Sequence, residues 1–220
     1  MQESDNKTIT PTSESTETKP TASPAAASPA GAPAAEGCYA ITHPFGFPQP
    51  SDIDADGVMV VVEIPQGSAN KYEIDPATGQ IVLDRVQSMP VAYPANYGSI
   101  PQSLGGDGDP LDALVLTREP LAPGVQVRVR PIGMLNMIDG GEADEKVIAV
   151  PVDDVDPHFS DYQNITDLPA IQQQAIEQFF SVYKNLPEGR KEVELNGFAE
   201  AGPTANALKQ ALDSYRQSCS

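Results

Sequence analysis

Residues 57–65 read GVMVVVEIP, a run of mostly β-branched side chains that ends in a carboxylate, an isoleucine and a proline. Residues 71–86 follow as KYEIDPATGQIVLDRV, in which two β-rich halves flank a Pro-Ala-Thr-Gly turn. Branched side chains favour strands because they fit the pleated surface, and Gly/Pro turns commonly bound short strands. The first run therefore predicts a strand and the second predicts a β-hairpin.

More strands are predicted further along the chain. They are ALVLT at residues 113–117, VQVRVRPIGML at 125–135 and EKVIAVPV at 145–152. The runs are short, close together and joined by Gly/Pro turns, with no helical pattern between them. This arrangement favours a small antiparallel barrel over a doubly wound sheet.

Two helices are expected after the strands. In the first, Thr166 or Asp167 is the expected cap and Pro169 lies in the first turn. Its apolar stripe comprises Leu168, Ile171, Ala175, Ile176, Phe179, Phe180 and Tyr183. The second helix is expected at residues 204–217, with Leu208, Ala211, Leu212 and Tyr215 facing inward.

Residues 1–37 are rich in Ser, Thr, Pro and Ala, which predicts a disordered tail ahead of one domain at residues 38–220. No apolar segment follows Met1, so the tail does not have the pattern of a signal peptide. Tails of this kind also follow lipid-modified N-termini in exported proteins. Cys38 and Cys219 lie at opposite ends of the predicted domain, where a disulfide and two separate thiols are both compatible with the sequence.

The chain has 220 residues and a formal net charge of −18, from 13 basic and 31 acidic side chains. Such a charge repels nucleic acids, because affinity for them comes largely from Lys and Arg. A membrane span is not expected, since no run of about eighteen apolar residues occurs. An acidic surface accounts for most of the charge, and the remainder suits a site for divalent cations.

The segment DGDPLD at residues 107–112 places three carboxylates on a Gly/Pro loop ahead of a predicted strand. Asp107, Asp109 and Asp112 repel one another unless a cation lies between them, and hard divalent cations prefer oxygen ligands. A solvated Asp-rich turn is the alternative for this segment taken alone. An EF-hand is excluded, because Arg118 stands where its twelfth residue, a glutamate, is required.

A second acidic loop, DGGEADEK at residues 139–146, joins two predicted strands and ends in Lys146. Alone it is typical of a charged hairpin loop. Together with residues 107–112, it supplies carboxylates and a cation that could meet at one end of a barrel.

Other charged and tyrosine residues have ordinary structural explanations when taken singly. Lys71 and Glu73 share a strand face by their spacing, as cross-strand ion pairs often do. Tyr93 and Tyr97 lie in an irregular segment, where buried tyrosines usually fill core space. At the end of the first predicted helix, a lysine is favoured by the helix dipole.

The order of these segments is more specific than any one of them. The chain has E-I-P-x₅-K-Y-E from residue 63, D-R at 84–85, A-Y-P-A-N-Y-G at 92–98, D-G-D-P-L-D at 107–112, D-x₄-D-x-K at 139–146 and F-F-x-x-Y-K at 179–184. This series resembles the soluble family I inorganic pyrophosphatases, and DGDPLD matches their signature in full. The resemblance spans residues 57–218. It departs at Gly140, where relatives often carry an acid, and at the N-terminal tail.

The resemblance implies magnesium-dependent hydrolysis of pyrophosphate to two phosphates, with Mn²⁺ or Zn²⁺ as substitute ions. Asp109 corresponds to the general base, while Glu63 and Glu73 correspond to residues that hold metal-bound waters. The implied metal ligands are Asp107, Asp112, Asp139 and Asp144. The implied phosphate-binding residues are Lys71, Arg85, Lys146, Tyr183 and Lys184, with Tyr97 in the metal site and Tyr93 supporting the cavity wall.

The implied fold is an α+β domain dominated by β-structure, an OB-like closed barrel of five strands with two flanking helices. Family members of this size are commonly hexamers in the cytoplasm, so a homo-oligomer is expected. The tail and the cysteine pair leave an exported, lipid-anchored protein as the alternative location. Single-stranded nucleic-acid binding and a non-catalytic calcium module are the rival functions, but the first needs a basic groove with exposed aromatics. The second does not need the Lys, Arg and Tyr residues, and an inactive pyrophosphatase does not need the full acidic set.

Overall fold

The computed structural model describes residues 38–220, so the predicted disorder of residues 1–37 lies outside the described residues. The strands are β1 (Val58–Ile64), β2 (Asn70–Ile74), β3 (Ile81–Val86), β4 (Asn96–Ser99), β5 (Asp112–Val115), β6 (Gln126–Asp139), β7 (Glu142–Ala143), β8 (Lys146–Pro151) and β9 (Val193–Glu200). The α-helices are α1 (Ile53–Asp56), α2 (Ala170–Val182) and α3 (Ala201–Ser218), and short 3-10 helices lie at Pro44–Gly46, Pro157–Phe159 and Ile165–Asp167.

Five strands form a closed ring in the order β1, β4, β5, β8 and β6, because β6 pairs back onto β1. The mostly β-structured fold, with its ring of five strands and few helices, confirms the predicted fold class. One detail differs from the antiparallel prediction, since β5 and β8 run parallel. Parallel neighbours need a connection that crosses over, and the long strand β6 lies between them in sequence and supplies it.

The β2–β3 hairpin forms a separate two-stranded sheet, as its sequence predicts, with a register shift between Lys71 and Tyr72. Most of β3 is exposed to solvent. Its strand β2 contacts β1 of the ring. The hairpin therefore adds one wall beside the ring without belonging to it.

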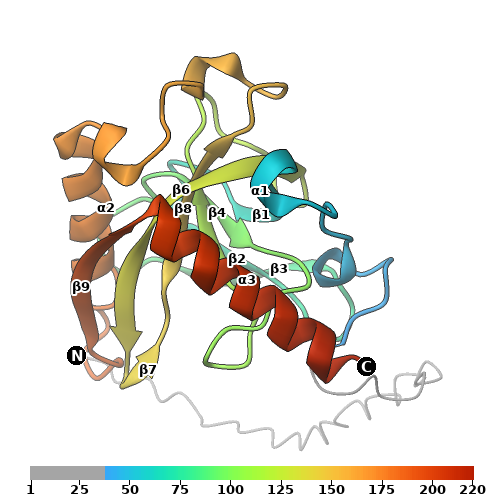
Figure 1. The fold of residues 1–220 in the computed structure, drawn as a ribbon. Helices are drawn as coiled ribbons and strands as arrows, with labels where there is room; N and C mark the ends of the chain where they lie inside the picture. The colour runs from blue at the N-terminus through green and yellow to red at the C-terminus, as the bar shows by residue number, and fades with distance from the viewer. Residues whose placement is uncertain (1–37) are drawn as a thin grey trace, which may run out of the picture. The chain divides into compact units, whose positions relative to one another are not determined.

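Alternating side chains of β8 divide the core into two clusters. Val147 and Ala149 pack with Leu208 and Leu212 of α3, whereas Ile148 lies in the cluster that contains the aromatic residues of α2. Successive residues of a strand point to opposite faces, so one strand can serve both clusters. The inward residues predicted for the second helix, which runs diagonally across the ring in Figure 1, are confirmed as buried.

The first predicted helix corresponds to α2. Its first residue and part of its predicted apolar stripe differ from the prediction. α2 begins after Pro169 with no side-chain cap, because Asp167 instead closes a capping box with Asn164 around the preceding 3-10 turn. Ile171 is 72% exposed, and Ala175 is exposed too. The buried face of α2 consists of Ile176, Phe179 and Phe180, which lie within its last two turns.

Three strand assignments were missed or only partly anticipated. Tyr97 lies in β4 and not in an irregular segment, β7 occupies the second acidic loop, and β9 pairs with β6. The sequence of β9, VELNGFAE, contains Asn196-Gly197, a pair typical of turns. Here it coincides with an irregularity in the β6–β9 register instead of ending the strand.

Cys38 and Cys219 form a disulfide with Cα atoms 5.5 Å apart, which settles the alternative that the sequence left open. The bond joins the residue that begins the described chain to the residue that follows α3. Among the described residues, no helix has the length and apolar character needed to cross a membrane.

Candidate active site

One cavity of about 370 Å³ opens between the ring and the hairpin. Its wall includes every residue that the sequence analysis selected, drawn from segments that are far apart in the chain. These residues are Glu63, Lys71, Glu73, Arg85, Tyr93, Tyr97, Asp107, Asp109, Asp112, Asp139, Asp144, Lys146, Tyr183 and Lys184. The structure therefore brings the predicted set together at one place.

A buried ion-paired group lies at the floor of the cavity. The parallel register of β5 and β8 places Asp112 directly opposite Lys146, whose ammonium group contacts the carboxylates of both Asp112 and Asp144. Lys146 is only 2% exposed. Burial alone would lower the pKa of Lys146, but the charges of Asp112 and Asp144 outweigh it and raise the pKa. The lysine thus stays charged while buried.

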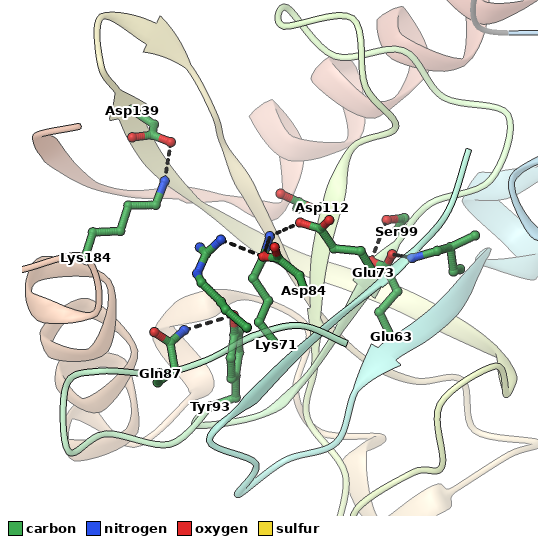
Figure 2. Close-up of polar contacts among 12 residues, drawn as sticks. Glu63, Lys71, Glu73, Asp84, Gln87, Tyr93, Ser99, Asp112, Asp139 and Lys184 are labelled. Carbon is green, nitrogen blue, oxygen red and sulfur yellow. Dashed lines mark hydrogen bonds and ion pairs between the residues drawn. The ribbon is translucent and has the colours of Figure 1, made fainter. Parts of the chain in front are cut away.

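Asp139 lies at the end of β6, and its Oδ2 contacts the ammonium group of Lys184, which follows α2 (Figure 2). Its other carboxylate oxygen, Oδ1, is buried and has no hydrogen-bond partner among the described residues. Gly140 comes next with a φ of +59°, a left-handed conformation that glycine adopts freely. The turn sends the chain back towards Asp144, so both ends of this loop reach the cavity.

Glu63 joins the ring to the hairpin. Its Oε1 accepts a hydrogen bond from the Ile74 N–H at 2.8 Å, and its Oε2 accepts one from Ser99 Oγ at 2.9 Å. Burial is the main reason that the pKa of Glu63 rises to about 7, and the charge of Asp112 adds to the rise. Ser99 had no assigned role in the sequence analysis, because a lone serine in a strand carries no distinctive signal.

The hairpin contributes a connected set of charges (Figure 2). Lys71 pairs with Glu73 and lies 3.3 Å from Asp84 Oδ2, and the same oxygen accepts a hydrogen bond from Arg85 Nη1 at 2.6 Å. Sequence reasoning gave Asp84 no role, although it stands beside Arg85 in the quoted D-R pair. The Arg85 Nε–H is buried and has no partner among the described residues. It is a donor that an anion in the cavity could satisfy.

Local hydrogen bonds shape the DGDPLD loop. Asp107 Oδ1 accepts a hydrogen bond from the Asp109 N–H at 3.0 Å, and the Gly105 N–H donates to the Asp109 carbonyl at 2.7 Å. Burial raises the pKa of the Asp109 carboxyl, and the charges of Asp107 and Asp112 raise it further. A carboxylate with a raised pKa accepts a proton more readily than an isolated aspartate.

Three tyrosines complete the wall. Tyr93 packs against Phe179 with ring centroids 4.7 Å apart, and the Lys146 ammonium lies 5.8 Å from the centre of the Tyr97 ring. Burial raises the pKa of Tyr93, Tyr97 and Tyr183 well above the usual tyrosine value. These phenols therefore remain protonated at neutral pH and serve as neutral hydrogen-bonding groups.

Comparison with known proteins agrees with this geometry. Residues 60–216 match the family model described as inorganic pyrophosphatase. The inorganic pyrophosphatase of Gluconobacter oxydans is 48% identical over 163 residues, which cover 74% of this chain and 91% of that protein. The chain belongs to the inorganic pyrophosphatase family.

Solved pyrophosphatase structures share the fold. The enzyme from Thermus thermophilus superimposes with a TM-score of 0.75 and 39% identity, covering 80% of this chain and 99% of that one. The enzyme from Helicobacter pylori gives a TM-score of 0.73 and 40% identity, covering 77% of this chain and 98% of that one. The matched family region starts at residue 60, so residues 38–59 lie ahead of it.

Pyrophosphatases are metal-dependent, and the carboxylates of this cavity suit a hard cation. Within residues 38–220, no three His, Cys, Asp or Glu side chains lie close enough to form a complete metal-binding cluster. Asp112, Asp139 and Asp144 instead contact lysines. Magnesium needs only one or two protein carboxylates beside waters and substrate phosphate, and the unpartnered Asp139 Oδ1 supplies a free ligand oxygen. The donor set therefore fits magnesium.

Proposed function

We propose that this chain hydrolyses inorganic pyrophosphate to two phosphates and that Mg²⁺ is its natural metal. The observation that carries the proposal is the convergence of carboxylates, lysines and an arginine on one cavity of about 370 Å³. Pyrophosphate carries three to four negative charges, so its hydrolysis requires neutralisation of charge and alignment of the attacking water. The similar proteins named inorganic pyrophosphatases support the same substrate.

The acidic side of the cavity holds the metal ions in this proposal. Asp107, Asp112, Asp139 and Asp144 are the ligands, while Glu63 and Glu73 hold waters around the ions. When bound, Mg²⁺ supplies positive charge and lowers the pKa of water, and Mn²⁺ or Zn²⁺ can replace it. Asp109, whose carboxylate has a raised pKa, takes the proton from the attacking water.

The basic side of the cavity binds the phosphates. Lys71, Arg85 and Lys184 provide positive charge at the rim, and the buried Arg85 Nε–H is free to donate to a phosphate oxygen. Lys146, at the floor of the cavity, stabilises the negative charge of the phosphates. Tyr97 and Tyr183 donate neutral hydrogen bonds because their pKa values keep them protonated, and Tyr93 supports the wall.

The direct test is phosphate release from pyrophosphate with Mg²⁺, with EDTA, and with Mg²⁺ restored. Turnover should require Mg²⁺, vanish with EDTA and return on readdition. Absence of turnover at every magnesium concentration would refute the proposal.

The same assay on Asp109→Asn tests the general base, because loss of that base should remove the acid limb of the pH–rate profile. An unchanged profile would show that another group takes the proton.

We also propose a homo-oligomer, with a hexamer favoured by the family resemblance, and light scattering of the purified chain tests this by its mass. The family resemblance also leads us to propose that the protein lies in the cytoplasm. The comparisons lend no support to the exported, lipid-anchored alternative. The Cys38–Cys219 disulfide is nevertheless a bond typical of oxidising compartments. Thiol trapping in freshly lysed cells, followed by mass spectrometry, decides between the two: free thiols at both cysteines fit the cytoplasm, and an intact bond contradicts it.

A further inference from the structure

Residues 38–47, here called the N-terminal strap, lie outside the family match that starts at residue 60 and yet reach the active-site cavity. Tyr39 and Phe45 of the strap line that cavity together with the predicted site residues. Cys219, which holds the strap, also lies outside the match, which ends at residue 216. The strap and its covalent bond therefore lie outside the region that the family model matches.

The strap has an ordered interior. The Tyr39 ring stacks on His43 with centroids 4.5 Å apart and meets the edge of Phe45 at 5.3 Å. Phe45 is buried in a cluster with Val61 of β1 and Ile74 of β2. The strap thus has its own aromatic core, which packs onto both the ring and the hairpin.

One side of the strap supports the hairpin that carries Lys71 and Arg85. His43 Nε2 lies 3.4 Å from the Asp75 carbonyl in the hairpin turn. Pro44 packs closely on Gly79, the glycine of that turn. A Cβ added at Gly79 would lie only 2.8 Å from Pro44 Cδ. A movement of the strap would therefore free the hairpin turn.

The other side of the strap supports the approach to the DGDPLD loop. The Gln102 N–H donates to the Phe45 carbonyl at 2.9 Å, and Gln102 Nε2 donates to the Gly46 carbonyl at 3.1 Å. Tyr39 of the strap lines the same cavity as Asp107 and Asp109 of that loop. The strap accordingly bridges the phosphate-binding hairpin and the acidic loop.

Two attachments hold the start of the strap: the Cys38–Cys219 disulfide and a hydrogen bond of 3.1 Å from the Tyr39 N–H to Tyr215 Oη of α3. The residues immediately after Tyr39 are exposed, Ile41 by 71%. This first part of the strap therefore has few buried contacts, and a segment of that kind opens more easily once its covalent anchor is lost.

We propose that the Cys38–Cys219 disulfide holds the N-terminal strap as a wall of the active site, with Tyr39 as a positioning residue, so that substrate affinity depends on the oxidation state of this cysteine pair. Reduction by a dithiol breaks the S–S bond. Two electrons and two protons pass to Cys38 and Cys219, which become thiols, and the dithiol becomes a disulfide. The strap then loses its anchor, and the hairpin and acidic loop lose their common support.

The test uses the chain from residue 38 onward beside the full chain, each assayed oxidised and after reduction by a dithiol. The two lengths should behave alike, because residues 1–37 are not part of the strap. Reduction should raise the KM for magnesium pyrophosphate about five-fold with a smaller change in kcat, and reoxidation should restore it. Circular dichroism before each assay confirms that the reduced protein is still folded.

Variants separate positioning from stability. In the oxidised protein, Tyr39→Ala should raise KM about as much as reduction does, whereas Tyr39→Phe, which keeps the stacked ring, should stay near the parent value. Ile41→Ala, at an exposed position of the same strap, is the matched control and should change nothing. An unchanged KM in the reduced folded protein would overturn the proposal, and an unchanged KM in Tyr39→Ala would overturn the positioning role of Tyr39. A KM that rises only together with loss of folded signal would assign the disulfide a purely structural role and overturn the proposal too.

Discussion

The ring and the hairpin contribute to the same cavity in different ways. The ring presents Asp112 of β5 and Lys146 of β8, strands with neighbours on both sides, and Asp144 just before β8. These ion pairs centre on the Lys146 side chain, which is 2% exposed, whereas the side chains of Asp112 and Asp144 are 24% and 18% exposed. The hairpin presents Lys71, Asp84 and Arg85 on a two-stranded sheet, and these side chains are 20–27% exposed. Buried charges interact strongly and are expensive to leave unpaired, whereas exposed charges are screened by solvent. Substitutions in the ring should therefore have larger effects than those in the hairpin.

The largest effect is expected at Asp112 of the ring. Asp112→Asn preserves shape and leaves Lys146 paired with Asp144, but it removes a negative charge from the proposed metal site. We expect kcat for pyrophosphate to fall at least about 1,000-fold with the circular dichroism spectrum unchanged. The control is Asp154→Asn, which removes a surface carboxylate paired with Arg128. Turnover of Asp112→Asn close to that of the parent would remove Asp112 from the proposed metal site.

The second effect concerns stability at Glu63, where the ring meets the hairpin. Its pKa is about 7 in the folded protein against 4.5 as the ordinary value, so the folded state binds the proton more tightly. The free energy of unfolding contributed by this group is therefore greatest at low pH and declines as pH rises from about 4.5 to about 7.

Glu63→Gln keeps a neutral side chain at every pH and should abolish that decline. Relative to the parent, its free energy of unfolding should be similar near pH 4 and higher by up to roughly 3 kcal/mol near pH 8. Urea denaturation with EDTA present measures the free energy of unfolding of parent and variant at each pH. Glu119→Gln, at an exposed position, is the control. If the two proteins differ equally at both pH values, the carboxyl is not titrating across this range.

The smallest effect is expected in the hairpin. Arg85→Lys keeps the charge but loses the planar set of donors, including the buried Nε–H. We expect kcat/KM for pyrophosphate to fall about ten-fold, because a lysine cannot make bidentate hydrogen bonds to a phosphate. Steady-state kinetics measures this, with Arg216→Lys on the exposed face of α3 as the control. A loss as large as that of Asp112→Asn would erase the distinction between the two regions.

Much of the site could be predicted because its residues occur in short ordered segments. DGDPLD, the D-x₄-D-x-K loop and F-F-x-x-Y-K are each local in sequence, and their series resembles one family. Ser99 and Asp84 escaped prediction for the opposite reason. Ser99 matters through its hydrogen bond to Glu63, and Asp84 through its contacts with Lys71 and Arg85, and neither residue type is distinctive in its own segment.

The fold shows the same division. Runs rich in Val and Ile predicted most of the ring strands and the hairpin, because a strand's side-chain pattern is local. The parallel pairing of β5 with β8 and the pairing of β9 with β6 depend on partners distant in the chain. The exposed Ile171 likewise shows that helical periodicity defines a face but not how far along the helix a neighbour covers it.

By itself, the sequence determined the acidic character, most of the ring strands, the hairpin and the residue types that reach the site, since these follow from composition and local periodicity. Tertiary structure alone decided that Asp112 faces Lys146, that Glu63 is buried enough for its pKa to rise, and that Cys38 meets Cys219. The physical reason is that ion pairing, desolvation and disulfide formation depend on distances between segments, and those distances are set only when the ring closes.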